Sequence, residues 1–133
     1  MPFQFSTTVR NATLDAIESE IGVSPTLEIR TGSVPASCAT ADAGTALASM
    51  ALPSDWMTAA ATGSKNLSGS WSDAAADAAG IAGHFRVKVG ATCHIQGTVT
   101  ITGGGGDMIL DNTNIAVGQQ ITVTSFTLNA GGA

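Results

Sequence analysis

The chain has 133 residues, with five Lys and Arg against ten Asp and Glu, and a formal net charge of −5. Its length fits one domain, expected over 1–133, and a hydrophobic fraction of 44% excludes intrinsic disorder. The acidic balance excludes a nucleic-acid binder that works through a basic face. Only 11% of the residues are charged. Because a monomer usually keeps about 25–35% of its surface residues charged, we expect a homo-oligomer.

Residues 1–5 are expected to form an extended arm. Phe3 and Phe5 alternate with Gln4, a pattern typical of a strand, and nothing local would bury either ring. We therefore expect the arm to contact a neighbouring subunit.

One amphipathic helix is predicted over 6–22. Three consecutive hydroxyl side chains offer N-caps, and Gly22 is placed to end the helix. Leu14, Ile17 and Ile21 form an apolar stripe at helical spacing. The polar faces are mostly acidic, whereas a membrane-binding helix carries many Lys and Arg residues. The stripe is therefore expected to pack on the protein's own sheet.

After the helix the pattern changes to period two. Residues 26–31 alternate cleanly and stop at Gly32, which predicts a strand. Further short strands are expected at 45–52 and 66–71. The Ala-rich stretch 72–80 is expected to be a connection, with at most one turn of helix.

Two strands at 84–89 and 93–101 form the strongest hairpin pattern. A two-residue loop between them would place apolar residues opposite polar ones on both faces. A three-residue loop over 90–92, with a bulge, pairs Val87 with Ile95 and keeps the apolar residues together. The three-residue loop is therefore predicted.

The C-terminal part is expected to add another hairpin and a bent strand. Gly103–Gly106 is predicted as a flexible hairpin tip that leads into a strand at 107–110. The last strand, 120–128, changes phase before Phe126. A bulge near 124–125 would bring the apolar residues on both sides of it into the core.

These elements predict a mainly β fold. We expect an antiparallel β-sandwich over 23–133, jelly-roll or Ig-like, with seven to eight strands and the single N-terminal helix.

Targeting segments are not expected. The N-terminus has no basic stretch followed by an apolar one, so no secretory signal is predicted. The run 112–133 carries no charge, but polar residues interrupt it at strand-like intervals, which excludes a membrane helix. We expect synthesis in the cytoplasm and no membrane partner.

No catalytic, cofactor-binding or metal site is assigned. Cys93 and His94 are neighbours in a strand, so their side chains point to opposite faces and form no dyad. The spacing of Cys38 and Cys93 matches no zinc or redox motif, and free thiols are expected, with a disulfide as the alternative. His84 and His94 are expected on one solvent face, without a carboxylate to complete a metal site.

Two other arrangements are also set aside. The run Gly103–Gly106 lacks the Lys and the following helix of a phosphate loop. Asp107, Asp111 and Asn112 offer oxygens for Ca²⁺ without the spacing of a known calcium loop. No cofactor and no enzymatic activity are therefore expected.

The remaining candidates are contact residues for a partner. Trp56 and Trp71 are the only indoles; they fit packing in the core or between subunits better than stacking on a sugar. The candidate interface residues are aromatic or basic: Phe3, Phe5, Trp56, Trp71, His84, Arg86, Lys88 and His94.

Three segments together resemble a known group of proteins. They are 5–12 (FSTTVRNA), 82–87 (AGHFRV), and 106–113 (GDMILDNT) with 118–128 (GQQITVTSFTL). The chain resembles the small virion-associated structural proteins of tailed bacteriophages. The likeness spans nearly the whole chain and rests on strand and turn patterns.

The resemblance implies a non-enzymatic structural role in a virion assembled in the host cytoplasm. It favours a capsid decoration (cement) protein that binds the outer shell in many copies. The implied partners are the major capsid protein and further copies of this chain, with a trimer favoured, and neither nucleic acid nor membrane. The alternative is a tail or tail-tip accessory protein, whose partners are tail proteins and which contacts a host glycan through a Trp.

Overall fold

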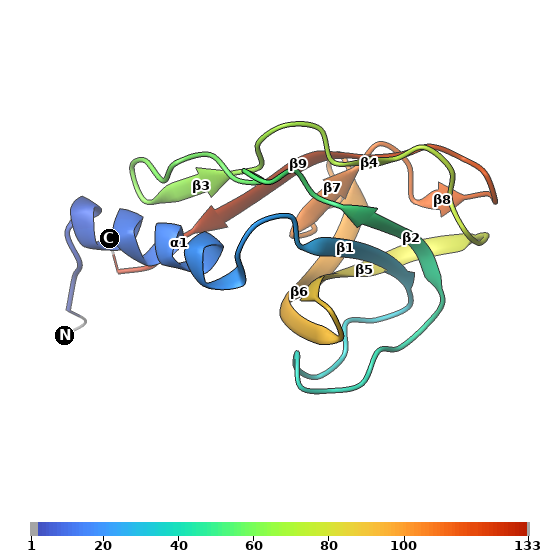
Figure 1. Ribbon diagram of the computed structural model, residues 1–133, viewed down its shortest axis with the longest axis horizontal. Helices are drawn as coiled ribbons and strands as arrows, with labels where there is room; N and C mark the ends of the chain where they lie inside the picture. The colour runs from blue at the N-terminus through green and yellow to red at the C-terminus, as the bar shows by residue number, and fades with distance from the viewer. Residues whose placement is uncertain (1–2, 133) are drawn as a thin grey trace.

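The computed structural model describes residues 3–132 and has one helix followed by nine strands (Figure 1). The elements are α1 (Thr7–Ile21), β1 (Thr26–Thr31), β2 (Ala46–Ala51), β3 (Ser64–Asn66), β4 (Ser72–Asp73), β5 (Gly80–Val89), β6 (Thr92–Ile101), β7 (Met108–Leu110), β8 (Asn114–Ile115) and β9 (Ile121–Asn129). The prediction of a mainly β chain with one helix is confirmed.

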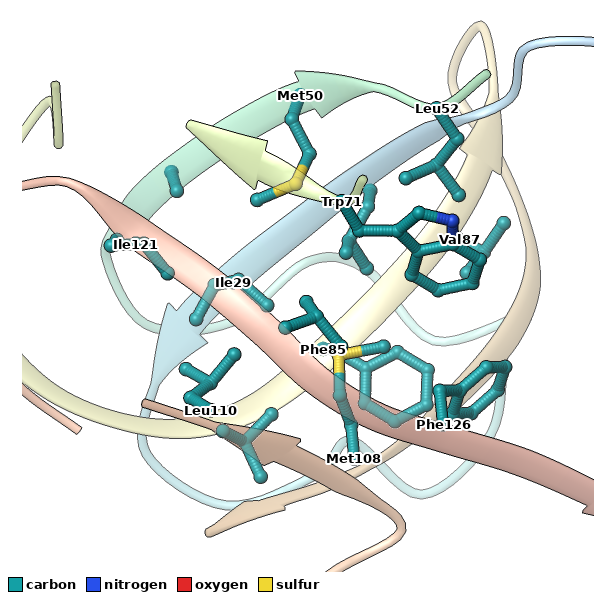
Figure 2. Close-up of a cluster of buried hydrophobic side chains, with 14 of the residues drawn as sticks. Ile29, Met50, Leu52, Trp71, Phe85, Val87, Met108, Leu110, Ile121 and Phe126 are labelled. Atoms are coloured by element: carbon teal, nitrogen blue, oxygen red, sulfur yellow. The ribbon is translucent and has the colours of Figure 1, made fainter. Parts of the chain in front are cut away.

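The strands form one mixed sheet in the order β2-β1-β5-β6-β7-β9-β3, with β4 on β9 and β8 on β5. The pair β6–β7 is parallel and the others are antiparallel. This differs from the antiparallel β-sandwich of seven to eight strands that the sequence predicted. Figure 2 shows side chains from the β1, β2 and β5 part of the sheet pointing toward those of β7 and β9, so the core lies between the two parts.

The helix matches its predicted bounds. The Ser6 hydroxyl accepts from the Val9 N–H at 3.2 Å, and the Gly22 N–H donates to the Glu18 carbonyl at 2.9 Å. Leu14 is buried, whereas Ile17, one turn later, is only half-buried. The stripe packs on the protein's own chain at its two ends and leaves its middle partly open.

The first predicted strand is confirmed, whereas the middle of the chain differs in part from the prediction. β1 has the predicted bounds and β2 lies within 45–52. The strand expected at 66–71 is wrong, because β3 ends at Asn66, only Leu67 beyond it forms an isolated bridge, with Met57, and a strand resumes at β4. Gly69 has φ of +75°, a turn conformation that interrupts a strand. The Ala-rich stretch forms no helix.

The predicted β5–β6 register is confirmed from Val87 toward the start of β5, but the pairing next to the turn and the loop are different. Val87 faces Ile95 as predicted. Val89 faces Thr92, which leaves a two-residue loop that begins at Gly90 with φ of +60°. The bulge lies inside the strands, where the register shifts between Val87 and the next residue. A bulge placed after the turn corrects the phase as well as a longer loop would.

The glycine run does not form a hairpin. β7 pairs in parallel with the end of β6, so the chain must double back between them. It does so by folding onto Thr100, whose hydroxyl accepts from the Gly106 N–H at 2.9 Å. A Cβ at Gly104 or Gly106 would collide with the Thr100 side chain. Glycine is therefore needed here for close approach.

The bulge in the last strand is confirmed. Ser125 faces Ile109 and Val123 faces Leu110, so Thr124 is the extra residue of β9. Val123 and Phe126 are both buried as a result.

The helix stripe gives a matched pair of stability tests. Leu14→Asp should lower the free energy of unfolding by about 3–5 kcal/mol, because it buries a carboxylate without a partner. Ile17→Asp should cost about 1 kcal/mol, since its side chain reaches solvent. Urea denaturation followed by circular dichroism measures both. Equal losses would contradict the described position of the helix.

Candidate functional site

The two tryptophans belong to the core. Trp56 and Trp71 are 0% and 1% exposed, with ring centroids 6.0 Å apart. Each indole N–H donates to a backbone carbonyl, that of Gly22 at 2.9 Å and that of Ser68 at 3.1 Å. Their selection as interface candidates is wrong, and the alternative interpretation of core packing is confirmed. Neither ring is available to stack on a sugar.

Three further candidates are buried on the other face of the sheet. His84, Arg86 and Lys88 are 0%, 2% and 6% exposed, although their alternation in β5 predicted a solvent face. The covering residues are 32–45, the connection from β1 to β2, which bonds to this face at several points. We call this connection the cover segment. The alternation of residues in β5 correctly placed these three side chains on one face of the sheet, but it could not show that the cover segment lies on that face.

Asp42 of the cover segment neutralises the charges on this face. Its Oδ2 lies 2.6 Å from Lys88 Nζ, and its Oδ1 accepts from Arg86 Nη1 at 3.0 Å. Arg30 Nη2 lies 3.5 Å from Oδ2. The Lys88 hydrogen bond holds the pKa of Asp42 below its ordinary value of 3.8, against the opposing effect of burial. This carboxylate therefore stays ionised between three cations.

A disulfide and neutral contacts complete the attachment of the cover segment. Cys38 is bonded to Cys93 of β6, so the expectation of free thiols is wrong and the alternative holds. Gln96 Nε2 donates to the Pro35 carbonyl at 2.8 Å, and His84 Nδ1 lies 3.0 Å from the Gly32 carbonyl. The cysteines are 55 residues apart, so only the return of the chain across the sheet brings them together.

The sequence holds a signal for this cluster that pattern reasoning missed. Asp42 is the only charged residue between Arg30 and Asp55. A single carboxylate in a long uncharged connection, beside a strand face with cations at Arg86 and Lys88, indicates a buried ion pair.

A second cluster fastens α1. Lys65 of β3 is 1% exposed, and its Nζ lies 2.7 Å from Asp15 Oδ1 and 2.8 Å from Glu18 Oε1. Burial would lower the pKa of Lys65, but the hydrogen bonds to the two carboxylates outweigh it and raise that pKa above 10.5. The same carboxylates accept backbone N–H groups of Met57 and Ala60.

The two clusters together determine the charge of the exterior. They engage Arg30, Lys65, Arg86 and Lys88, four of the five Lys and Arg residues. Six carboxylates have no ion pair in the part of the chain that the structure describes: Glu20, Asp55, Asp73, Asp77, Asp107 and Asp111. The outward charge is therefore almost entirely negative.

The surviving candidates border one apolar groove. Phe3 and Phe5 are 77% and 46% exposed, with rings in edge contact at 5.4 Å, and His94 is exposed. His94 and Phe5 line two hollows of about 320 and 390 Å³ that share Thr13 and Ile17 of α1. We call the continuous hollow along this helix face the α1 groove.

A third hollow, of about 350 Å³, continues the α1 groove toward β7. It shares Asn129 with the hollow beside Phe5. Its walls include Ile95 of β6 and Leu128 of β9, with Phe85 behind them. Sequence patterns did not identify these residues as a site, because each is an ordinary apolar position of a strand.

The acidic residues considered for calcium have structural roles. Asp107 Oδ2 accepts from the N–H and the hydroxyl of Thr98, and Asp111 Oδ1 accepts from the Thr122 N–H. Over residues 3–132 no three His, Cys, Asp or Glu side chains gather as a metal site would require. His84 and His94 do not share a solvent face, since His84 is buried.

Comparison with known proteins adds no assignment: no family model, curated protein or solved structure matches the chain. Within the described residues, α1 is the one helix, and it is neither long nor apolar enough to cross a membrane.

Replacing Asp42 tests the buried cluster. Asp42→Ala should lower the free energy of unfolding by about 2–3 kcal/mol, because Arg86 and Lys88 stay buried without their carboxylate. The figure lies below that of a fully buried pair because the Asp42 side chain is 32% exposed. Asp77→Ala, which removes an exposed carboxylate without an ion pair, is the matched control and should cost less than 0.5 kcal/mol or so.

The pH dependence separates charge from packing in the same variants. Because the pKa of Asp42 is depressed in the folded chain, its stabilisation is complete above its ordinary value of 3.8 and is lost as the pH falls through the folded value. Asp42→Asn should therefore lose less stability than the wild type between pH 5 and pH 2 or so. Identical acid profiles would show that Asp42 acts without its charge.

Proposed function

We propose that this protein is a non-enzymatic structural component of a bacteriophage particle, a decoration protein that binds the outer capsid shell in many copies. The α1 groove carries the proposal. It is open, apolar and elongated, and it has Phe5 near one end and His94 near the other. Such a surface suits packing against another protein, whereas a small-molecule site is enclosed and has converging polar groups.

The segments that resemble phage virion proteins contribute to this groove. The first supplies Phe5 to the groove, and the second and third supply Phe85 and Leu128 to the third hollow, which continues it. The resemblance therefore concerns the surface through which we expect the protein to assemble, as well as the strand pattern.

The charge distribution supports assembly in a defined orientation. Copies of this chain repel one another wherever their free carboxylates approach, since like charges are unfavourable at short range. The arm is free of this repulsion, because residues 1–9 carry no charged side chain. We propose that the protein forms a trimer and that its partner on the shell, the major capsid protein, offers a neutral or basic surface.

Fractionation of particles tests the proposal. Heads and tails separated from dissociated particles are probed with an antibody against the purified protein, and an antibody against the major capsid protein controls the separation. We expect the protein in the head fraction, in many copies. Its presence in tails alone would favour the tail accessory role, and its absence from both fractions would overturn the virion assignment.

A further inference from the structure

The third hollow lies in a gap between two strands of the sheet. Consecutive residues of β6, Ile95 and Gln96, both line it, as do Thr127 and Leu128 of β9. Successive side chains of a strand point to opposite faces of a sheet. A hollow lined by both members of each pair therefore lies between the edges of the strands, not on one face.

The register shows what the gap would hold. β7 fills the space between β6 and β9 at one level, where Met108 faces both Val99 and Phe126. One residue earlier the strand ends, and the Asp107 side chain stays in this space beside β6, where its carboxylate accepts from the N–H and the hydroxyl of Thr98. Along the same line, residues 96–98 of β6 lie across from residues 127–129 of β9 with no strand between them in the described chain. We call this gap the β6–β9 slot.

Backbone groups of β9 point into the slot. The Phe126 carbonyl accepts from Leu67 and the Ala130 N–H donates to Gly63, both on the β3 side. Since successive residues of a strand direct their N–H and C=O groups to alternate sides, those of Thr127 and Asn129 face away from β3 and into the slot.

The same reasoning applies to β6. The Thr98 N–H donates to Asp107 at 2.9 Å, on the side away from β5. Two residues earlier, Gln96 therefore directs its N–H and C=O groups to this side as well. The slot thus presents backbone donors and acceptors from both walls, which an added strand would satisfy.

The shape of the slot selects a strand with aromatic side chains. The inner side of the slot is lined by Leu128 and by the edge-packed rings of Phe85 and Phe126, whose centroids are 5.4 Å apart. Gly97 has no side chain, and a Cβ there would meet both the Asp107 side chain and the Phe85 ring, so the room for an added side chain lies toward Phe126 and Leu128. An aromatic ring from an added strand would pack against these two rings.

We propose that the β6–β9 slot binds the N-terminal arm of a second copy of this chain as an added strand. The arm alternates Phe3, Gln4 and Phe5, as a strand with two inward aromatic rings would, and both rings are exposed. The slot spans three residues on each wall. In its own chain the Phe5 N–H donates to the Gly132 carbonyl at 2.6 Å, which holds the arm beyond the end of β9.

Charge complements this match in shape. Residues 1–9 carry no acidic side chain, whereas the slot holds the Asp107 carboxylate, which lies over Gly97 and Thr98 of its β6 wall. An acidic segment would be repelled there, so the arm is better suited to the slot than the charged parts of the chain. The inference rests on the proposed self-association and names the contact that produces it.

Sedimentation equilibrium of the full-length protein tests the proposal. Phe3→Ser with Phe5→Ser should raise the dissociation constant for self-association at least tenfold. Val117→Ser is the matched control: Val117 is 69% exposed and follows β8, at the opposite end of the molecule from the N-terminus (Figure 1). Its dissociation constant should equal that of the wild type.

A second pair of variants examines the slot itself. Thr127→Pro removes the N–H that points into the slot, and it should raise the dissociation constant as much as the arm variant does. Thr127→Val keeps the N–H and loses only the hydroxyl that bonds to Asn66, so it should associate like the wild type. Circular dichroism melts establish that each variant is folded.

Each outcome bears on the proposal separately from the virion assignment. The arm–slot contact is overturned if the arm variant has the same dissociation constant as the wild type. It is also overturned if Thr127→Pro and Thr127→Val raise the dissociation constant equally. A wild-type protein that stays monomeric at all concentrations also overturns the contact between two copies. The same holds if the protein is monomeric because the arm inserts into the slot of its own chain. In each case the presence of the protein in heads, measured independently, still decides the proposed function.

Discussion

The interaction between Asp42 and the cations of β5 is the constraint on which the rest of the structure depends. Arg86 and Lys88 are buried, and a buried cation without a partner destabilises a fold by several kcal/mol. Asp42 removes this cost and holds the cover segment against the sheet. With one face covered by this segment and the other by the core, β5 lies inside the molecule. The contacts that we propose lie at the periphery, along α1 and at the open edges of β6 and β9.

Internal neutralisation of the cations also shapes how the protein meets its surroundings. The clusters around Asp42 and Lys65 pair four of the five cations with carboxylates, so the charge on the exterior is mostly negative. Two copies that associate as proposed would meet the least repulsion where free carboxylates are few. The described part of the arm carries no charged side chain, the α1 groove has one of each sign, Arg10 and Glu20, and the β6–β9 slot has one carboxylate, Asp107. Charge and strand geometry therefore favour the same region for assembly.

Local patterns in the sequence predicted the local structure well and the long-range structure poorly. The caps of α1, the alternation of β1 and the phase change at Thr124 depend on neighbouring residues, and each prediction was confirmed. The parallel pairing of β7, the disulfide and the covered face of β5 depend on residues far apart in the chain. Of the candidate site, the exposed Phe3, Phe5 and His94 were predicted, whereas the slot required knowledge of which strand edges remain unpaired.

Amide hydrogen exchange measured residue by residue tests the arm–slot contact most directly. The N–H groups of Gln96, Thr127 and Asn129 point into the slot, while those of their neighbours Gly97 and Leu128 point into paired strands. We expect the three slot amides to be protected from exchange at concentrations where the protein associates, and to exchange rapidly on dilution. The two neighbouring amides should stay protected at all concentrations. Slot amides whose exchange does not change with concentration, in a protein that does associate, would contradict the arm–slot contact.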